Sequence, residues 1–483
     1  MAVDRLDAVV IGTSVEGLVA AAALATAGRA VTVVERRVDG AAMGDGADAV
    51  ISAGVVRELD LTSHGLRFAA APPVVGVGAE KALILWPELH AAQASVAALS
   101  GRDGEALTGF YARLARAAVP DEASAAAWLT AAHGEPSEAM LFRLTSIARL
   151  LDEAFDNELL KGVLAQGAVM GTGAAPHAPA SGQLLTRQSL LAHAVPEAGH
   201  RFVAGGERRL RQALLALLKF YNNADVVFGA EVKEIATERE AASGVVLADG
   251  TVLRAPLVIS ALAPEHAEAL LTGLKRARPA HLAPRASVMP AQLKLTIGAL
   301  PKLAGVDAAT LTSGAIVRLA PSMARLAAAH GAFRGLSLPA QPCLDLRFVP
   351  RAEAKPRWDL HVSMPYVPAT TNEGPWSAAR RDKLRGLIVR TIDEVSAGFG
   401  ASVEAAEMRH PAEAEGLLDI GGPALMASNA VRDQTAVPEA HAPAALSLLK
   451  GLSIVEPTLY GGIGEAGLQA AATGSLVKAR ADA

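Results

Sequence analysis

The sequence predicts an α/β fold, and three separated stretches carry that prediction. The chain opens with "DAVVIGTSVEGLVAAAALATAGRAVTVVERR" (7–37), which has the order strand, glycine turn, alanine-rich helix, strand and acid. A second stretch (200–265) contains an amphipathic helix followed by short strands, and a third (440–483) repeats strand, glycine-rich turn and helix. Alternating strands and helices pack as a parallel sheet with helices on its faces. The three stretches therefore predict one nucleotide-type domain assembled from separated segments.

The opening stretch justifies its elements in order. Ala8–Ile11 is a continuous apolar run, as expected of a parallel strand buried on both faces. Gly17–Gly28 is a helix-forming, alanine-rich segment that Gly28 ends as a C-cap. Ala30–Val34 is a second, β-branched strand, and Glu35 follows it.

Later segments are predicted in the same way. "RFVAGGERRLRQALLALLKF" predicts a turn into an amphipathic helix, whose arginines are expected on a solvated face. Its apolar face comprises Leu210, Leu214, Leu217 and Leu218. Short strands follow, with Asp249-Gly250 as a hairpin turn. Helices are expected between Leu89 and Leu164, strands at "CLDLRFV" and "WDLHVSMPYV", and a helix over Ser377–Phe399.

Length and composition predict two domains. A chain of 483 residues exceeds one comfortable hydrophobic core, and 51% hydrophobic with 19% charged residues excludes a disordered chain. The predicted nucleotide-type domain comprises 1–66, 200–265 and 440–483, and the second domain comprises 67–199 and 266–439. The net charge is −4 with both signs interspersed, so no nucleic-acid partner is expected.

The single cysteine and scattered histidines exclude several chemistries. Cys343 alone cannot form an intrachain disulfide, a cysteine-based zinc site or a CxxC redox pair, so disulfide-reductase chemistry is excluded. We expect this thiol to be a small apolar filler in or near a strand. The twelve histidines lack metal-binding spacing, so no metal site is predicted.

The N-terminus gives no targeting signal. "MAVDRLD" lacks a basic segment followed by an apolar one, and Leu18–Ala27 is too short to cross a bilayer. We therefore expect a cytoplasmic protein and leave open a peripheral contact with a membrane surface.

The turn Gly12-Thr13-Ser14-Val15-Glu16-Gly17 departs from the dinucleotide-binding pattern G-x-G-x-x-G at Ser14. In that pattern the glycines allow a tight turn, close approach of a diphosphate and close helix–strand packing. The Ser14 hydroxyl can itself donate to phosphate, whereas a carboxylate at Glu16 repels a diphosphate unless it points to solvent. An acid in a helix's first turn also has a purely structural explanation, since the helix dipole stabilises it. With Glu35 placed to accept from ribose hydroxyls, the layout predicts dinucleotide binding.

The chain as a whole resembles the phytoene desaturase-like branch of FAD-dependent oxidoreductases, and within it the group of pyridine nucleotide-disulfide oxidoreductase domain-containing protein 2. The similar segments include "GLVAAAALATAGRAVTVVERR", "FVAGGERRLRQAL", "GVVLADGTVLRAPLVISALAPEHA" and "WDLHVSMPYVPA". The resemblance implies a glutathione-reductase-type FAD/NAD(P)-binding Rossmann-like domain with an inserted α+β substrate domain. It also implies FAD as cofactor and an apolar small-molecule substrate, isoprenoid or lipid-like, that undergoes desaturation or isomerisation by hydride transfer with the flavin.

The resemblance further implies a set of cofactor-binding residues, but no catalytic residue. Gly12, Ser14 and Gly17 would face the diphosphate, and Glu35 the adenosine ribose. Arg36 and Gly40 would lie in the loop after that strand, and Val232 would meet adenine through its backbone. Gly205 and Gly206 would open the helix of the middle segment, while Gly461, Gly462 and Gly464 would cover the flavin end.

Several loops differ from the family pattern, and they leave an alternative open. Besides Ser14 and Glu16, the paired glycines after the ribose strand appear as Asp39-Gly40, and the tail reads "PTLYGGIG". The alternative is a flavoprotein fold without bound FAD that acts as a binding or scaffold subunit. The GDP-dissociation-inhibitor group shows that this fold can be kept for protein binding. The oligomeric state is not predicted.

Overall fold

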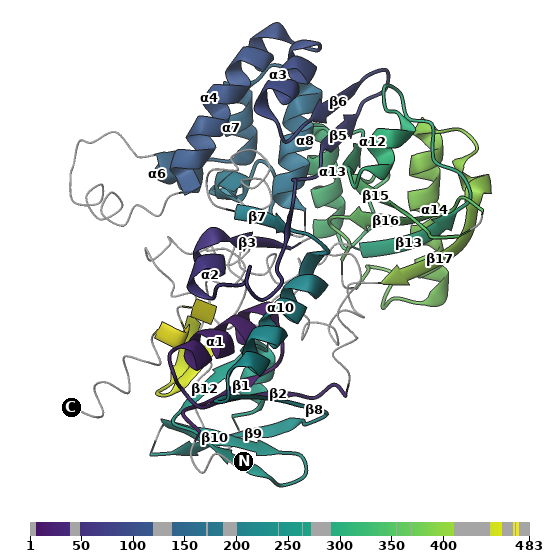
Figure 1. Cartoon of the computed structure of the whole chain (residues 1–483). Coiled ribbons are helices and arrows are strands. Elements are labelled where there is room, and N and C mark those ends of the chain that lie inside the picture. The colour runs from purple at the N-terminus through teal and green to yellow at the C-terminus, as the bar shows by residue number, and fades with distance from the viewer. Residues whose placement is uncertain are drawn as a thin grey trace.

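The computed structural model describes most of the chain as two sheet-based lobes (Figure 1). The described residues are 6–38, 49–118, 138–170, 172–186, 200–239, 241–262, 264–271, 291–353, 355–368, 370–409, 445–455, 467–468 and 470–472. A six-stranded sheet organises the lobe that contains the N-terminal strand, and a seven-stranded sheet organises the other.

The six-stranded sheet draws its strands from three separated parts of the chain, in the order β18-β19-β12-β1-β2-β8. Its strands are β1 (Ala8–Ile11), β2 (Val31–Glu35), β8 (Ala224–Phe228), β12 (Leu257–Ser260), β18 (Ala445–Leu449) and β19 (Leu452–Val455). β1 pairs in parallel with β2 and β12, while β18 alone runs antiparallel to its neighbour. Parallel strands in a covered sheet are buried on both faces, and β1, β2 and β19 are buried along their whole length. The exact domain boundaries stay a prediction.

Two helices cover one face of this sheet side by side (Figure 1). α1 (Val15–Thr26) and α10 (Gly206–Phe220) share a hydrophobic cluster with β1 and β2. The predicted apolar face of α10 is confirmed, because all four of its predicted leucines are buried there. The alanines of α1 shorten the distance to its neighbours, since a small side chain lets two elements approach closely.

A three-stranded antiparallel sheet covers the opposite side of β1. It consists of β9 (Val232–Glu238), β10 (Ala241–Leu247) and β11 (Val252–Arg254). Its Ile235 and Val245 form a buried cluster with Val9 and Ile11 of β1. The predicted Asp249-Gly250 hairpin joins β10 to β11, and the Asp249 carboxylate accepts from the Thr251 amide at 2.8 Å.

A smaller sheet links the two lobes. β3 (Val50–Ser52), β7 (His200–Val203) and β4 (Phe68–Ala69) pair antiparallel, and α2 (Ala53–Glu58) follows β3. β7 leads into α10, and α11 (Pro264–Ala269) follows β12.

The seven-stranded sheet has the order β17-β13-β16-β15-β14-β5-β6. Its strands are β5 (Val74–Val77), β6 (Ala82–Leu85), β13 (Ala291–Ile297), β14 (Ile316–Leu319), β15 (Leu344–Pro350), β16 (Trp358–Met364) and β17 (Val403–Arg409). Leu384, Ile388 and Ile392 of α14 (Ala378–Val395) cover one face. The two strands predicted within 343–349 and 358–367 and the helix predicted over 377–399 are present, although the second strand ends at Met364 and the helix ends at Val395. Of the short elements, α12 (Ala308–Thr312) contacts β15 and η5 (Phe399–Ser402) contacts α14.

A helical layer packs on the same lobe (Figure 1). It comprises α3 (Leu89–Ala97), α4 (Gly101–Ala118), α6 (Glu138–Leu144), α7 (Ile147–Ala154), α8 (Glu158–Val169), η2 (Ser181–Thr186) and α13 (Met323–Arg334). α8 approaches β5 closely, since a Cβ on Gly76 would lie 2.3 Å from Val163 Cγ2. None of the described helices combines the length and the apolarity needed to cross a membrane.

Cys343 is buried immediately before β15, as predicted for an apolar filler. Burial raises the pKa of its thiol to about 12. The thiolate form is therefore absent at neutral pH, which removes the nucleophilic reactivity of this side chain.

Two helix glycines give a matched test of the packing. We expect Gly162→Ala to destabilise the protein by about 2–3 kcal/mol, because overpacking against a rigid backbone cannot relax. A Cβ on Gly162 would lie 2.3 Å from the Pro321 carbonyl oxygen. Gly109→Ala, in α4, should instead stabilise by about 0.5–1 kcal/mol, since alanine favours helix and no atom lies within 4 Å. Urea unfolding measures both; equal effects would contradict the packing of α8.

Candidate cofactor site

The candidate site lies at the carboxyl ends of three parallel strands, β12, β1 and β2. The chain passes from β1 to β2 on one side, while β12 lies on the other side of β1. Ligands of open parallel sheets bind in the crevice at such a switch in strand order. The turn after β1 is held between both neighbours. The Gly12 amide donates to the Val34 carbonyl at 2.9 Å, and the Ala261 amide donates to the Ile11 carbonyl at 2.9 Å.

Gly12 and Gly17 make this turn sterically possible. Gly12 has φ +93°, a left-handed conformation that strains other residues. A Cβ on Gly17 would lie 2.7 Å from the Gly12 carbonyl oxygen and 2.8 Å from Ala261 Cβ. The first turn of α1 can therefore sit directly against the end of β1. Contact of either glycine with a diphosphate stays a prediction.

Ser14 is the N-cap of α1, and its hydroxyl accepts a hydrogen bond from the Gly17 amide at 3.3 Å. Serine is favoured here because its oxygen satisfies one of the first amides of a helix. The amides of Ser14 and Val15 are buried, and no acceptor among the described residues bonds to them. Buried amides at a helix start, with the positive end of its dipole, fit a diphosphate group. This turn therefore suits the cofactor that the resemblance implies.

Glu35 is fixed beside the turn by three hydrogen bonds. Its Oε2 accepts from the Thr13 hydroxyl at 2.6 Å and from the Thr13 amide at 3.1 Å, and its Oε1 accepts from the Arg37 amide at 3.1 Å. Burial raises the pKa of this carboxyl, but the bonds from Thr13 and Arg37 together outweigh burial, so the pKa lies below its ordinary value. Glu35 is thus ionised at neutral pH, and Oε1 has lone-pair capacity for a ribose hydroxyl.

Two other predicted residues lie near the end of β2. Arg36 follows Glu35 and is exposed. Val232 opens β9 and is half-buried. The Ala230 amide donates to the Glu35 carbonyl at 3.0 Å, so the approach to β9 runs beside the end of β2. The fold therefore brings Glu35 and Val232 to the same edge, although contact with adenine is untested.

Gly205 and Gly206 also lie toward this edge of the sheet. Both have positive φ, +81° and +65°, and Gly205 is the N-cap of α10. α1 leads into β2 and α10 leads into β8, and these two strands are parallel. Both helices therefore begin at the carboxyl end of the sheet. The remaining predicted residues, Gly40, Gly461, Gly462 and Gly464, lie outside the described residues.

One buried charge differs from the sequence-based expectation. Arg211 was expected on a solvated face of α10, but it is only 1% exposed. Its Nη2 lies 2.8 Å from the Glu207 carboxylate, and burial outweighs this pairing to raise the pKa of Glu207. The i, i+4 spacing of Glu207 and Arg211 in "GERRLR" is the signal that could have revealed the pair.

For Glu16 the sequence left two explanations open: repulsion of a diphosphate unless the side chain points to solvent, or a structural role in the first turn of α1. The Glu16 side chain does not point to solvent: it is fully buried, and Oε2 accepts from the Gly467 amide at 3.0 Å. Residues 451 positions apart make this contact. No local sequence pattern could have revealed this contact, because only the folded chain brings the segment that contains Gly467 onto α1.

On β13, β16 and β15, the face of the seven-stranded sheet opposite α14 is polar. Lys294, His361 and Arg347 are register neighbours on β13, β16 and β15, and each is half-buried. The Lys294 ammonium lies 3.2 Å from the Asp359 carboxylate on the same face. Charged and hydrogen-bonding groups therefore dominate this part of the sheet. On β5 and β6, the same face carries Val74, Leu83 and Leu85, which pack in the apolar cluster under the helical layer.

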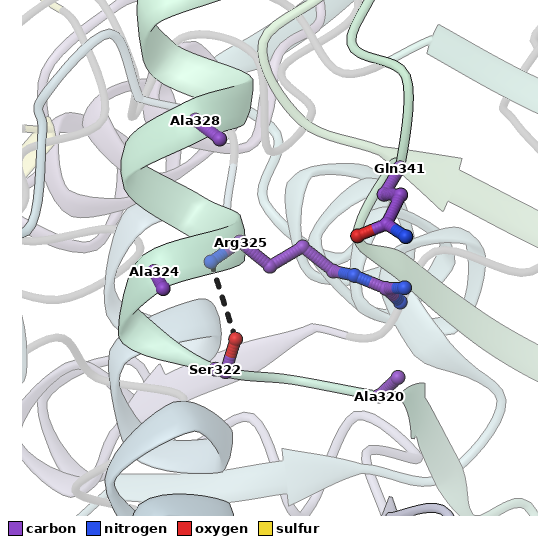
Figure 2. Close-up of a pocket in the computed structure, with 6 residues that line it drawn as sticks. All are labelled: Ala320, Ser322, Ala324, Arg325, Ala328 and Gln341. Carbon is purple, nitrogen blue, oxygen red and sulfur yellow. Dashed lines mark hydrogen bonds between the residues drawn. The ribbon is translucent and has the colours of Figure 1, made fainter.

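A cavity of about 500 Å³ opens at the start of α13 on the same lobe (Figure 2). It is lined by Ala320, Ser322, Ala324, Arg325, Ala328 and Gln341. The Arg325 side chain extends from the first turn of α13 toward Gln341, and the Ser322 hydroxyl accepts from the Arg325 amide at 3.2 Å. None of the predicted cofactor residues that the structure describes lines this cavity.

Comparison with known proteins confirms the predicted fold class and the predicted resemblance to the pyridine nucleotide-disulfide oxidoreductase domain-containing protein 2 group, while the phytoene desaturase-like assignment stays a prediction. No family model matches the chain. The chain is 27% identical over 315 residues to the mouse (Mus musculus) pyridine nucleotide-disulfide oxidoreductase domain-containing protein 2, covering 54% of this chain and 53% of that protein. The rat (Rattus norvegicus) protein of the same name is 29% identical over 120 residues, covering 25% of this chain and 20% of that protein. At its longest, the match spans about half the length of these curated relatives.

Two solved structures resemble the whole chain. An oxidoreductase from Methanosarcina mazei has a TM-score of 0.58 at 15% identity, covering 98% of this chain and 100% of its own. A putrescine oxidase variant with redesigned cofactor binding has a TM-score of 0.58 at 13% identity, covering 99% of both chains. The chain thus has the mixed α/β fold with a parallel, Rossmann-like core that the sequence predicts.

The cap of α1 can be tested by substitution at Ser14. We expect Ser14→Ala to destabilise the protein by about 1 kcal/mol, because the Gly17 amide loses its acceptor, and Ser14→Gly by only a few tenths. Urea unfolding measures both variants. A Ser14→Ala protein as stable as the wild type would contradict the cap.

The depressed pKa of Glu35 predicts a pH dependence of stability. The ionised Glu35 contributes to the free energy of unfolding. This contribution is fully present above the ordinary carboxyl pKa of 4.5 and is lost as the pH falls through the lower pKa of the folded state. The wild type's stability advantage over Glu35→Gln should therefore shrink as the pH falls below about 4.5 and on through the lower folded pKa. Thr13→Val should shift this loss to higher pH, since it removes the hydroxyl donor. A wild-type advantage that does not change with pH would refute the assignment.

Proposed function

We propose that this chain is an FAD-dependent oxidoreductase that transfers a hydride between a small-molecule substrate and the flavin. The observation that carries the proposal is the turn after β1, where the buried amides of Ser14 and Val15 face no protein acceptor in the described chain. The names of the mouse relative and of the Methanosarcina mazei structure both contain the word oxidoreductase, which supports this proposal.

Each part of the site has a binding task. The amides of Ser14 and Val15 hold the diphosphate, and the ionised Glu35 accepts hydrogen bonds from the adenosine ribose. The Thr13 hydroxyl orients that carboxylate and keeps it ionised. When bound, the flavin itself supplies the hydride chemistry, so a dedicated set of catalytic side chains is not required.

For the substrate, the family resemblance supports an apolar, isoprenoid or lipid-like molecule that undergoes desaturation or isomerisation. The neighbouring side chains of Lys294, His361 and Arg347 on β13, β16 and β15 favour a substrate that also carries a polar end. Such an amphipathic substrate suits a cytoplasmic enzyme that contacts a membrane surface peripherally.

The colour of the purified protein tests this function. We expect a yellow protein with a flavin absorbance band that is released on denaturation, at about one flavin per chain. Glu35→Ala should weaken FAD binding roughly 10- to 100-fold, because a charge-assisted hydrogen bond is lost. Glu58→Ala, which removes an exposed acid on α2, is the matched control and should bind like the wild type.

The opposite outcome supports the alternative. A folded protein that stays colourless after incubation with excess FAD contradicts the oxidoreductase and favours a binding or scaffold subunit. Circular dichroism of each variant separates lost binding from lost folding.

A further inference from the structure

Glu16 occupies an unusual position for a charged side chain. It lies in the first turn of α1 and is fully buried, and its Oε2 accepts from the Gly467 amide at 3.0 Å. Burying a carboxylate is costly unless donors replace the lost water. The Gly467 amide is such a donor. This contact therefore ties the last segment of the chain to the first helix.

The backbone of the last segment meets α1 at the same point. A Cβ on Gly467 would lie 2.3 Å from the Glu16 carbonyl oxygen and 2.9 Å from the Ala20 amide nitrogen. Ala470 and Ala471 are buried in the hydrophobic cluster that α1 forms. The segment thus packs on α1 through the small residues Gly467, Ala470 and Ala471. Within this apolar contact, Glu16 accepts a hydrogen bond from the Gly467 amide.

The charge of Glu16 has a second consequence. Glu16 directly follows Ser14 and Val15, whose amides are the proposed diphosphate donors. The dipole of α1 stabilises a carboxylate in this turn, but it attracts a diphosphate for the same reason. Two anionic groups that share one helix start repel each other, and little water lies around Glu16 to screen them.

We propose that Glu16 is a positioning residue that holds the last segment on α1 and, through its charge, lowers the affinity of the site for the diphosphate of FAD. The second half of the proposal rests on the proposed function. The two roles need different properties of the side chain: docking needs an oxygen acceptor, whereas repulsion needs a negative charge.

Glu16→Gln and Glu16→Ala separate these properties. Hydrogen exchange without FAD reports on docking: the peptide covering 467–472 should exchange at least about tenfold faster in Glu16→Ala, which leaves the amide unbonded. It should stay near the wild-type rate in Glu16→Gln, whose amide oxygen still accepts. FAD titration reports on charge: Glu16→Gln should bind on the order of tenfold tighter at low salt. The gain should change little as salt rises, because salt screens a buried charge much less than an exposed one.

Asp103→Asn is the matched control. Asp103 is equally buried and accepts from the Asp156 amide at 2.9 Å and the Asn157 amide at 2.7 Å, in the other lobe. This variant should change neither the exchange of 467–472 nor FAD affinity, although it loses stability.

Distinct outcomes overturn each half of the proposal. If hydrogen exchange of 467–472 is unchanged in Glu16→Ala, the docking role is overturned. This result does not depend on whether the protein binds FAD. Wild-type FAD affinity in Glu16→Gln at low salt overturns the charge role. A wild type and a Glu16→Gln variant that both bind no FAD overturn the proposed function together with the charge role, and the exchange result still decides docking.

Discussion

The close approach of α1 to the end of β1 is the constraint on which the candidate site depends. Gly17 permits it, because a Cβ there would lie 2.7 Å from the Gly12 carbonyl oxygen. The approach removes the first turn of α1 from water, although helix starts are rich in unpaired amides. Every polar group in this turn then needs a partner from elsewhere in the fold or from a ligand.

The surrounding residues supply most of these partners. Thr13 bonds to Glu35 across β1 and β2, Ser14 caps its own helix, and Glu16 receives the amide of Gly467. The amides of Ser14 and Val15 have no such partner in the described chain. The distribution of satisfied and unsatisfied groups, rather than the glycine pattern alone, is what makes a diphosphate site physically reasonable here.

The second lobe uses the same packing principle for a different purpose. A Cβ on Gly167 of α8 would lie 2.7 Å from the Arg318 guanidinium, so the missing side chain lets this buried arginine pass beneath the helix. The guanidinium donates to the Val163 carbonyl at 2.6 Å, and its Nε lies 3.4 Å from the Asp345 carboxylate. Close helix–sheet contact in both lobes thus places charged groups in the interior, where neighbouring oxygens must hold them.

The sequence by itself determined the local elements. β1 runs over the predicted Ala8–Ile11, and α10 buries the predicted leucine face, because apolar periodicity and glycine turns act over a few residues. It also determined that Gly12, Ser14 and Gly17 follow one strand and that Glu35 lies at the end of the next. Only the tertiary structure decided where the charges went: Arg211 lies inside, and Glu16 faces a residue 451 positions away. Long-range partners set the burial of a charged side chain, and no local sequence pattern contains them.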